Sequence, residues 1–347
     1  MPEQTEVENP IHRLTEEQLE AIGREFDELH EHVKSDLGDR DARYIRGIID
    51  LHRRLGLLGR GLLIASRFKP AWFAGTATLG VAKILENMEI GHNVLHGQWD
   101  WMNDPVINSQ AWDWDTASTA EAWRHSHNYV HHTYTNIRGK DKDLGYEIMR
   151  IDPHQPWHPV YLLQPIYNVI LMVLFEWGVA FHDMDFDAIR SGEKSKEQVL
   201  KDLNGIFYKA RLQVTKDYIA WPFVSGLVMT LVDLALTAAG LDLDPAPPAK
   251  ESRVERAKRK LDLARRKTVR RKPARSRGIE AVVRQLVDRK SFREPFKRTL
   301  WANVTANIVR NLWSNAIIFC GHFPDQTYTF SQEETEDETT GQRYVRQ

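Results

Sequence analysis

Apolar residues are gathered into four blocks along the chain, separated by polar stretches. The first block covers residues 55–90 and has two halves on either side of Pro70. Each half is shorter than the roughly 20 residues that a helix needs to cross a membrane. Three further blocks cover residues 157–181, 218–241 and 299–320. These lengths suit helices, and the pattern predicts an all-α protein built as an integral membrane helical bundle.

The first block predicts a helical hairpin that turns near Pro70, with His92 directly after the end of its second helix. Small residues at Gly75, Ala77 and Gly80 suit close packing of the two helices. The alternative is a pair of buried core helices in a soluble protein.

Residues 1–50 form a charged segment that predicts a helix. Thr15 is placed to cap the helix, with Gln18 at the third helical position. Apolar residues then recur at helical spacing, at Leu19, Ile22, Phe26 and Leu29. We expect this segment to lie on the cytoplasmic side.

The amino-acid composition does not decide between a membrane protein and a soluble protein. Of the 347 residues, 42% are hydrophobic and 27% are charged, which also suits a soluble protein. The single cysteine, Cys320, excludes an internal disulfide and any cysteine-based zinc site. The first fifty residues contain no apolar run of the kind found in a signal peptide.

A basic run between Lys250 and Arg298 follows the proline-rich stretch 244–248. It holds 20 Lys and Arg against 6 Asp and Glu, a net of +14. It lacks interleaved aromatic residues and any nucleic-acid fold signature, so we expect contact with lipid head groups or disorder, and no nucleic-acid partner.

Candidate chemistry is concentrated between Gly91 and Asn136, which hold six of the fourteen histidines. His92 and His96 are four residues apart, so on a helix they share one face. His127 and His131 repeat this spacing, while an α-helix turns the next residue, His132, about 100° away. The remaining histidine, His125, is expected to support the ligands or to be spare.

Neutral imidazole binds iron, zinc, copper or nickel. A lone pair of histidines at this spacing is usually two surface residues, but two pairs and an extra histidine exceed the four ligands of a typical zinc site. The count favours more than one metal ion.

The residues around these pairs resemble the first two histidine boxes of the membrane-bound fatty acid desaturases. The motifs are GHNVLH at 91–96, then HSHNYVHHTYTN at 125–136 and NLWSNAIIFCGHFPD at 311–325. The amino-acid sequence of these motifs is most similar to that of bacterial acyl-CoA or acyl-lipid desaturases of the actinobacterial type. His322 resembles the extra histidine that this family places after its last span.

The resemblance implies an O2-dependent fatty acid desaturase that uses two electrons to place a cis double bond in a long-chain acyl group. It implies a di-iron centre with two non-haem iron ions, carried by a cytoplasmic helical cap. Its expected metal ligands are His92, His96, His127, His131, His132 and His322. Residues expected to support them are His125, Glu89, Asp141, Asp143, Asn311 and Asn315. No catalytic residue beyond the ligands, and no site for an organic cofactor, is expected.

Expected partners are an acyl-CoA or acyl-lipid substrate, membrane lipids, and an electron donor of the ferredoxin, rubredoxin or flavin reductase type. The expected location is the bacterial plasma membrane, with the active site on the cytoplasmic face. A third histidine box is expected in this family, and the sequence to Gln347 has none, so we expect a C-terminally incomplete chain. Alternatives are a fatty acid or alkane hydroxylase with similar boxes, and a catalytically inactive desaturase fragment. A ferritin-like di-iron protein needs two Glu-x-x-His motifs, and only Glu89 to His92 fits.

These observations predict four regions. They are an N-terminal helical segment at 1–50, a first part of the desaturase domain at 51–244, a basic insertion at 245–298, and the continued, truncated domain at 299–347. If His132 and His322 share one metal site, an even number of membrane crossings separates them. We therefore expect the block 157–181 to lie in the interface or to dip in and return.

Overall fold

Helices make up all the regular structure in the described parts of the chain. The structure, a computed structural model, describes residues 9–241, 286–324 and 327–346. Within these ranges the only extended pairing is an isolated bridge between Ile137 and Phe330. The all-α prediction is therefore confirmed for the described residues.

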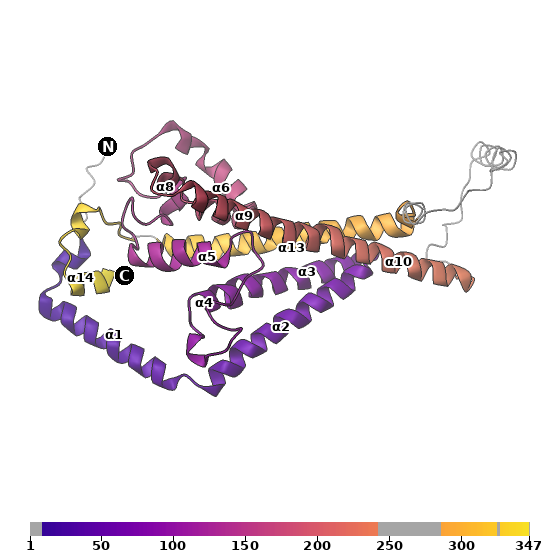
Figure 1. The fold of residues 1–347 in the computed structure, drawn as a ribbon, viewed down its shortest axis with the longest axis horizontal. Coiled ribbons are helices and arrows are strands. Elements are labelled where there is room, and N and C mark those ends of the chain that lie inside the picture. The colour runs from indigo at the N-terminus through magenta and orange to yellow at the C-terminus, as the bar shows by residue number, and fades with distance from the viewer. Residues whose placement is uncertain (1–8, 242–285, 325–326, 347) are drawn as a thin grey trace.

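Helices α2 (Asp39–Ile64) and α3 (Lys69–Ile84) form the predicted hairpin, with Pro70 in the first turn of α3 (Figure 1). A Cβ atom on Gly75 would lie 2.9 Å from Leu63 Cγ and 3.0 Å from the Gly59 carbonyl oxygen. Glycine thus allows the two backbones to approach closely. The expectation for Ala77 was wrong, because this residue is exposed.

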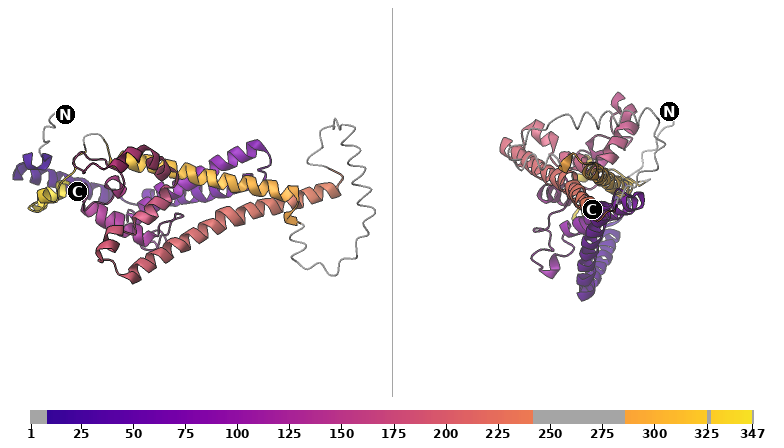
Figure 2. Two further views of the ribbon diagram at one scale, coloured as in Figure 1. Left: turned by 90° about the horizontal axis from the view of Figure 1, so that it is seen from above. Right: turned by 90° about the vertical axis from the view of Figure 1, so that its right-hand side faces the viewer.

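Helix α13 (Lys290–His322) packs against α3 and α10 (Trp221–Ala238). Figure 2 shows α10 and α13 approaching each other towards the C-terminal end of α10. From Thr299 onward, polar side chains of α13 are buried against protein, including Thr299, Asn303, Asn307, Arg310 and Asn311. The last apolar block therefore turns its polar face towards the other helices.

Ion pairs join the long helices to one another. Lys83 Nζ lies 2.7 Å from one carboxylate oxygen of Asp217, and Arg60 lies 3.1 Å from the other. Asp217 belongs to the π-helix η7 (Val214–Ala220), which connects α9 (Lys196–Gln213) with α10. A second buried pair joins Arg310 of α13 to Glu176.

Helices α6 (Gln164–Val173) and α7 (Phe175–His182) meet at a sharp bend of 99°, measured between the segments Pro159–Val173 and Phe175–Ser191. By length and composition one continuous helical run, Lys196–Ala238, could cross a membrane, and this bent pair would make a second crossing if it is one span. Among the described helices, the hairpin and α13 do not meet the same criterion.

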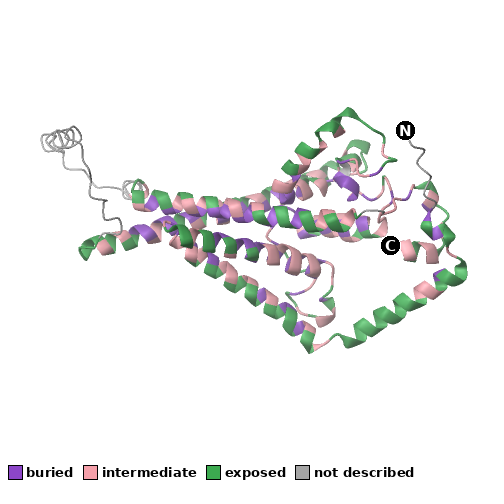
Figure 3. Cartoon of the chain, turned by 180° about the vertical axis from the view of Figure 1, so that it is seen from behind, coloured by how far each residue is buried: buried purple, intermediate pink, exposed green. Residues whose placement is uncertain are grey.

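Helix α1 (Glu16–Asp36) begins with the predicted capping box between Thr15 and Gln18. It packs against α14 (Thr340–Arg346), where Tyr344 lies edge-on to Phe26 with ring centroids 6.0 Å apart. Most of α1 is exposed (Figure 3). The N-terminal segment is thus held by the C-terminal one. Apart from the helices that carry or directly precede the candidate histidine ligands, the remaining short helices of the described residues are η1 (Pro10–Arg13), η3 (Asp100–Met102), η5 (Leu144–Glu147), η6 (Pro159–Leu163), α8 (Phe186–Ser191) and η8 (Glu333–Thr335).

Two of the expected region boundaries fall inside helices. The boundary at 50/51 lies within α2, and the boundary at 298/299 lies within α13. Residues 286–298 of the expected basic insertion are described and mostly belong to α13, whereas residues 245–285 lie outside the described residues.

Candidate metal centre

The first pair of histidines follows a π-helical turn. The π-helix η2 (Leu85–Gly91) leads into α4 (His92–Leu95), and the His92 N–H donates to the carbonyl of Asn87. The Nε2 atoms of His92 and His96 lie 3.2 Å apart. Two imidazole nitrogens at this distance hold a shared proton or a shared cation. The predicted common face of this pair is present.

The second group lies on another π-helix, η4 (Arg124–His131), which follows α5 (Ala120–Trp123). His127 and His131 stack with ring centroids 5.0 Å apart. In a π-helix the N–H of residue i+5 donates to the carbonyl of residue i, and the His132 N–H donates to the His127 carbonyl in this way.

This wider turn brings His132 closer to His127 than the α-helical spacing predicts. Its ring centroid lies 5.1 Å from that of His127 and 5.0 Å from that of His96. An α-helix would place residue i+5 much farther round the axis. The structure therefore brings His132 into the same cluster as the other histidines.

His322, the last residue of α13, joins the cluster from a distant part of the sequence. Its ring centroid lies 4.8 Å from that of His131. Its Nδ1 lies 2.8 Å from the Ile318 carbonyl oxygen, so Nδ1 carries the proton and Nε2 presents a lone pair. This Nε2 is buried and has no hydrogen-bond partner among the described residues, which is the arrangement that a metal ligand needs.

Two carboxylates accept hydrogen bonds from the Nδ1 atoms of His127 and His131. Asp141 Oδ1 accepts a hydrogen bond from His131 Nδ1 at 2.9 Å, and Asp143 Oδ2 accepts one from His127 Nδ1 at 3.0 Å. A proton on each Nδ1 leaves each Nε2 free to bind a metal. Both aspartates therefore lie where we expected supporting residues.

The donor atoms fall into two groups that share one residue. His127, His131, Asp143 and His322 form one group, and His92, His96 and His127 form the other; within each, the donor atoms lie within 4.8 Å of one another. Imidazole-rich sets with a carboxylate suit iron, zinc or copper. The residues present therefore fit a centre of two metal ions.

Burial keeps most of these rings neutral. It lowers the pKa of His92 to about 4, with help from the charge of His127, and it lowers the pKa of His96 to about 3 and of His132 to about 4. Burial also lowers the pKa of His131, but the hydrogen bond to Asp141 together with the negative charges of Asp143 and Asp141 outweighs it, so the pKa is raised overall. Burial raises the pKa of Asp143, but hydrogen bonds from His127 and His182 hold it well below its usual value.

Four expected supporting residues make no hydrogen bond to a cluster histidine within the described residues. His125 is exposed and stacks on Tyr129 with ring centroids 5.7 Å apart. Glu89 accepts a hydrogen bond from Tyr44. Asn311 donates to the Val173 carbonyl oxygen at 2.8 Å. The Nδ2 atom of Asn315 is buried and has no hydrogen-bond partner among the described residues.

One contributor, His182, was missed by the sequence reasoning. Its Nε2 lies 3.2 Å from Asp143 Oδ1. The signal available was the polar sequence HDMD at 182–185, directly after an apolar block.

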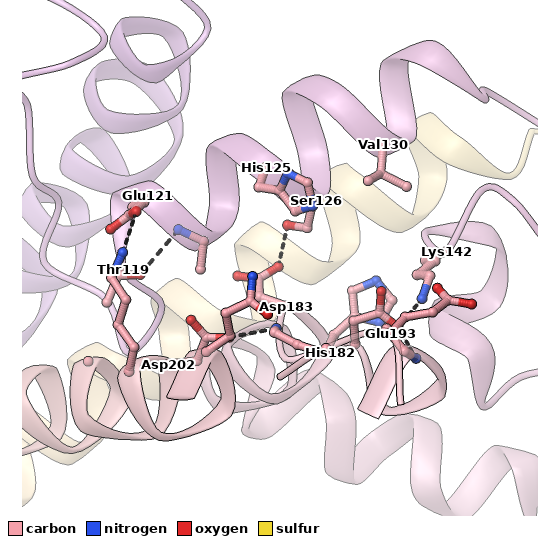
Figure 4. A pocket seen from close by; sticks show the side chains of 17 residues that line it. Thr119, Glu121, His125, Ser126, Val130, Lys142, His182, Asp183, Glu193 and Asp202 are labelled. Atoms are coloured by element: carbon pink, nitrogen blue, oxygen red, sulfur yellow. Dashed lines mark hydrogen bonds and ion pairs between the residues drawn. The ribbon is translucent and has the colours of Figure 1, made fainter. Parts of the chain in front are cut away.

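Three cavities adjoin the cluster. The largest, about 630 Å³, opens beside α5 and α9 and is lined by Ser126, His182 and Asp183 (Figure 4). The same three residues line a smaller cavity of about 40 Å³ against His127 and His322. A third, also about 40 Å³, extends from His92 towards Glu176 and Asn311. The two small cavities share apolar walls at Trp123, Phe175, Val179 and Ile318.

Comparison with known proteins places this site in a family. The model of the fatty acid desaturase family matches residues 69–242. An NADPH-dependent stearoyl-CoA 9-desaturase from Mycobacterium tuberculosis is 38% identical over 334 residues, covering 96% of this chain and 64% of the relative. A sn-1 linoleoyl-lipid 6-desaturase from Synechocystis is 31% identical over 122 residues, 33% of each chain.

The chain thus spans about 64% of the length of its mycobacterial relative. No solved structure shows significant similarity to it. The family match covers α3, the histidines from His92 to His132 and the run from α9 to α10, and it leaves out α2 and His322. The chain belongs to the fatty acid desaturase family.

Proposed function

We propose that this chain carries the metal centre of a fatty acid desaturase, which uses O2, two electrons and two protons to convert a methylene pair of a long-chain acyl group into a cis double bond, with release of two waters. The observation that carries the proposal is the convergence of six histidines from three distant segments around His127. Asp141 and Asp143 support the proposal, because their hydrogen bonds fix the protons on the Nδ1 atoms of two histidines and leave the Nε2 atoms free.

Two non-haem iron ions fit the two donor groups. His92 and His96 would hold one ion, and His131 and His322 the other. The free nitrogen of His127, Nε2, would bind one of the two ions, with Asp143 orienting the ring and His132 adjacent to both groups. Bound iron would supply the O2 activation that no amino-acid side chain provides for an unactivated C–H bond.

The chain's own residues position the reacting groups. The apolar walls shared by the two small cavities, formed by Trp123, Phe175, Val179 and Ile318, would hold the methylene pair beside His92 and exclude water. The large cavity beside Ser126, His182 and Asp183 would connect the cluster with solvent.

The substrate proposed is an acyl-CoA or acyl-lipid, and the printed name of the mycobacterial relative, a stearoyl-CoA 9-desaturase, favours a long saturated acyl-CoA. We also propose an external electron donor protein of the ferredoxin, rubredoxin or flavin reductase type. Residues 51–244 and 299–347 would form a single desaturase domain, since α13 packs on α3 and α10.

We propose that the domain lies in the bacterial plasma membrane with its site on the cytoplasmic face. Apolar side chains exposed on η6 and α6 would contact lipid; they include Leu162, Leu163, Ile166, Val169 and Ile170. The bend between α6 and α7 suits a segment that enters the bilayer and returns.

Product analysis tests this function. The purified full chain is loaded anaerobically with Fe²⁺ and given stearoyl-CoA, a reductase system and O2, and the acyl products are separated by gas chromatography with mass spectrometry. A monounsaturated product that depends on O2 supports the proposal. An alcohol would favour a hydroxylase, and no product from iron-loaded chain would favour a non-catalytic relative.

A further inference from the structure

His182 and Asp183, at the C-terminal end of α7, form hydrogen bonds with residues next to the second histidine group. His182 Nε2 lies 3.2 Å from Asp143 Oδ1, while Asp143 Oδ2 accepts the hydrogen bond from His127 Nδ1 at 3.0 Å. The carboxylate of Asp143 therefore lies between two imidazoles. His182 does not belong to any of the three histidine motifs found in the sequence.

The next residue, Asp183, holds the same π-helix at a neighbouring position. Its carboxylate accepts a hydrogen bond from Ser126 at 2.5 Å and another from Ser118. Figure 4 shows the Ser126 hydroxyl directed towards Asp183. Ser126 immediately precedes His127 in η4, so the end of α7 and its C-cap contact both the side chain next to His127 and the carboxylate that orients it.

The geometry separates His182 from the candidate ligands. Its Nε2 faces the carboxylate, and it is outside both donor groups. The side chains of His182 and Asp143 are only 9% and 12% exposed, so water does not compete strongly for this hydrogen bond. A carboxylate held on both sides has one orientation available.

We propose that His182, supported by Asp183, is a positioning residue that fixes Asp143 and thereby the tautomer and orientation of His127, the histidine shared by both donor groups. This proposal rests on the metal centre proposed above. Residues that orient metal-binding histidines commonly change metal affinity about 10- to 100-fold when they are replaced.

The test compares three variants of the full chain, using anaerobic Fe²⁺ titration against a competing chelator. His182→Leu removes the N–H donor. His182→Gln keeps an N–H donor at a similar distance from the backbone. His125→Leu is the matched control, because His125 is an exposed histidine of the same π-helix and stacks on Tyr129.

We expect His182→Leu to weaken Fe²⁺ binding about 10- to 100-fold, His182→Gln to recover most of the affinity, and His125→Leu to match wild type. Equal affinity of wild type and His182→Leu would overturn the positioning role. Equal losses in the Leu and Gln variants would also overturn it, because packing alone would then explain the effect.

A second readout needs no metal. In metal-free protein with ¹⁵N-labelled histidine, the ring nitrogen shifts report which nitrogen of His127 carries the proton. We expect the Nδ1–H tautomer in wild type and a mixture in His182→Leu. An unchanged tautomer would contradict the positioning role. Failure of wild type to bind Fe²⁺ would instead remove the proposed metal centre, which distinguishes the two.

Discussion

Asp141 and His131 are joined by a buried hydrogen bond of 2.9 Å between Oδ1 and Nδ1. The other oxygen of Asp141 accepts the backbone N–H of Asn136 at 2.8 Å, so the carboxylate is held at both ends. The turn that follows the second histidine group thus folds back to orient its own ligand.

Replacing Asp141 with Asn should therefore weaken metal binding. An amide accepts hydrogen bonds only on its oxygen, so Asn loses one of the two bonds, and we expect Fe²⁺ affinity to fall about 10- to 100-fold. The measurement is chelator competition. Asp50→Asn, a change at an exposed position of α2, is the control. Unchanged affinity in Asp141→Asn would show that this hydrogen bond does not orient a ligand.

The buried pair of Arg310 and Glu176 gives a prediction for stability. Glu176 also accepts from Gln213 at 2.8 Å, and both charged side chains are nearly inaccessible, at 1% and 4% exposed. Arg310→Met leaves an unpaired buried carboxylate and should destabilise the protein by about 3–5 kcal/mol. Thermal unfolding in detergent measures this change.

The double variant Arg310→Met with Glu176→Met should regain much of the lost stability, because no charge is then left unpaired. The exposed pair of Lys201 and Glu121 provides the control, and Lys201→Met should unfold with wild type. A double variant less stable than Arg310→Met would contradict this account of the pair.

Close packing in the hairpin predicts opposite effects for two glycines. Gly75→Ala places a Cβ 2.9 Å from Leu63 Cγ and should destabilise by about 1–3 kcal/mol. Gly56→Ala, in α2 with no atom within 4 Å, should stabilise by about 0.4–1 kcal/mol. Chemical unfolding of both variants checks the pair of signs, and equal changes would contradict the packing.

Acid should destabilise the metal-free protein. The folded pKa values of His92 and His132 are lowered to about 4 and that of His96 to about 3, from an ordinary value of 6.5. Between these limits the unfolded chain binds more protons, so these groups contribute stability above pH 6.5 that is lost as the pH falls towards 4 and 3.

His131 acts in the opposite direction. Its pKa is raised, so its contribution is present below pH 6.5 and is lost as the pH rises through the folded value. Burial also lowers the pKa of His322, so four lowered histidines outweigh His131 and the buried Glu86, whose pKa is raised to about 7. The unfolding temperature of metal-free protein should therefore drop from pH 7 to pH 5. A rise over that range would show that the cluster is not buried as described.

The sequence predicted those parts of the protein that depend on local pattern. Helical spacing paired His92 with His96 and His127 with His131, and the capping residues Thr15 and Gln18 marked the start of α1. Pro70 marked the turn of the hairpin. Spacing and capping are short-range properties, and they remain visible in one sequence.

Tertiary contacts decided the rest. The π-helical turn that redirects His132 has no simple sequence signal, and His182 reaches Asp143 across 39 residues. The choice between supporting and unrelated polar residues also depends on packing, which joins Asp143 to the cluster and turns Asn311 towards the Val173 carbonyl. The polar face of α13 becomes intelligible only when its protein neighbours are known.

The metal content of the purified full chain tests the central claim most directly. Because His127 lies where the two donor groups meet, wild type should hold about two iron ions per chain after anaerobic loading, and His127→Ala should lose at least one of them, whereas His125→Ala should keep both. Wild type without bound iron, or His127→Ala with undiminished iron, would contradict the account.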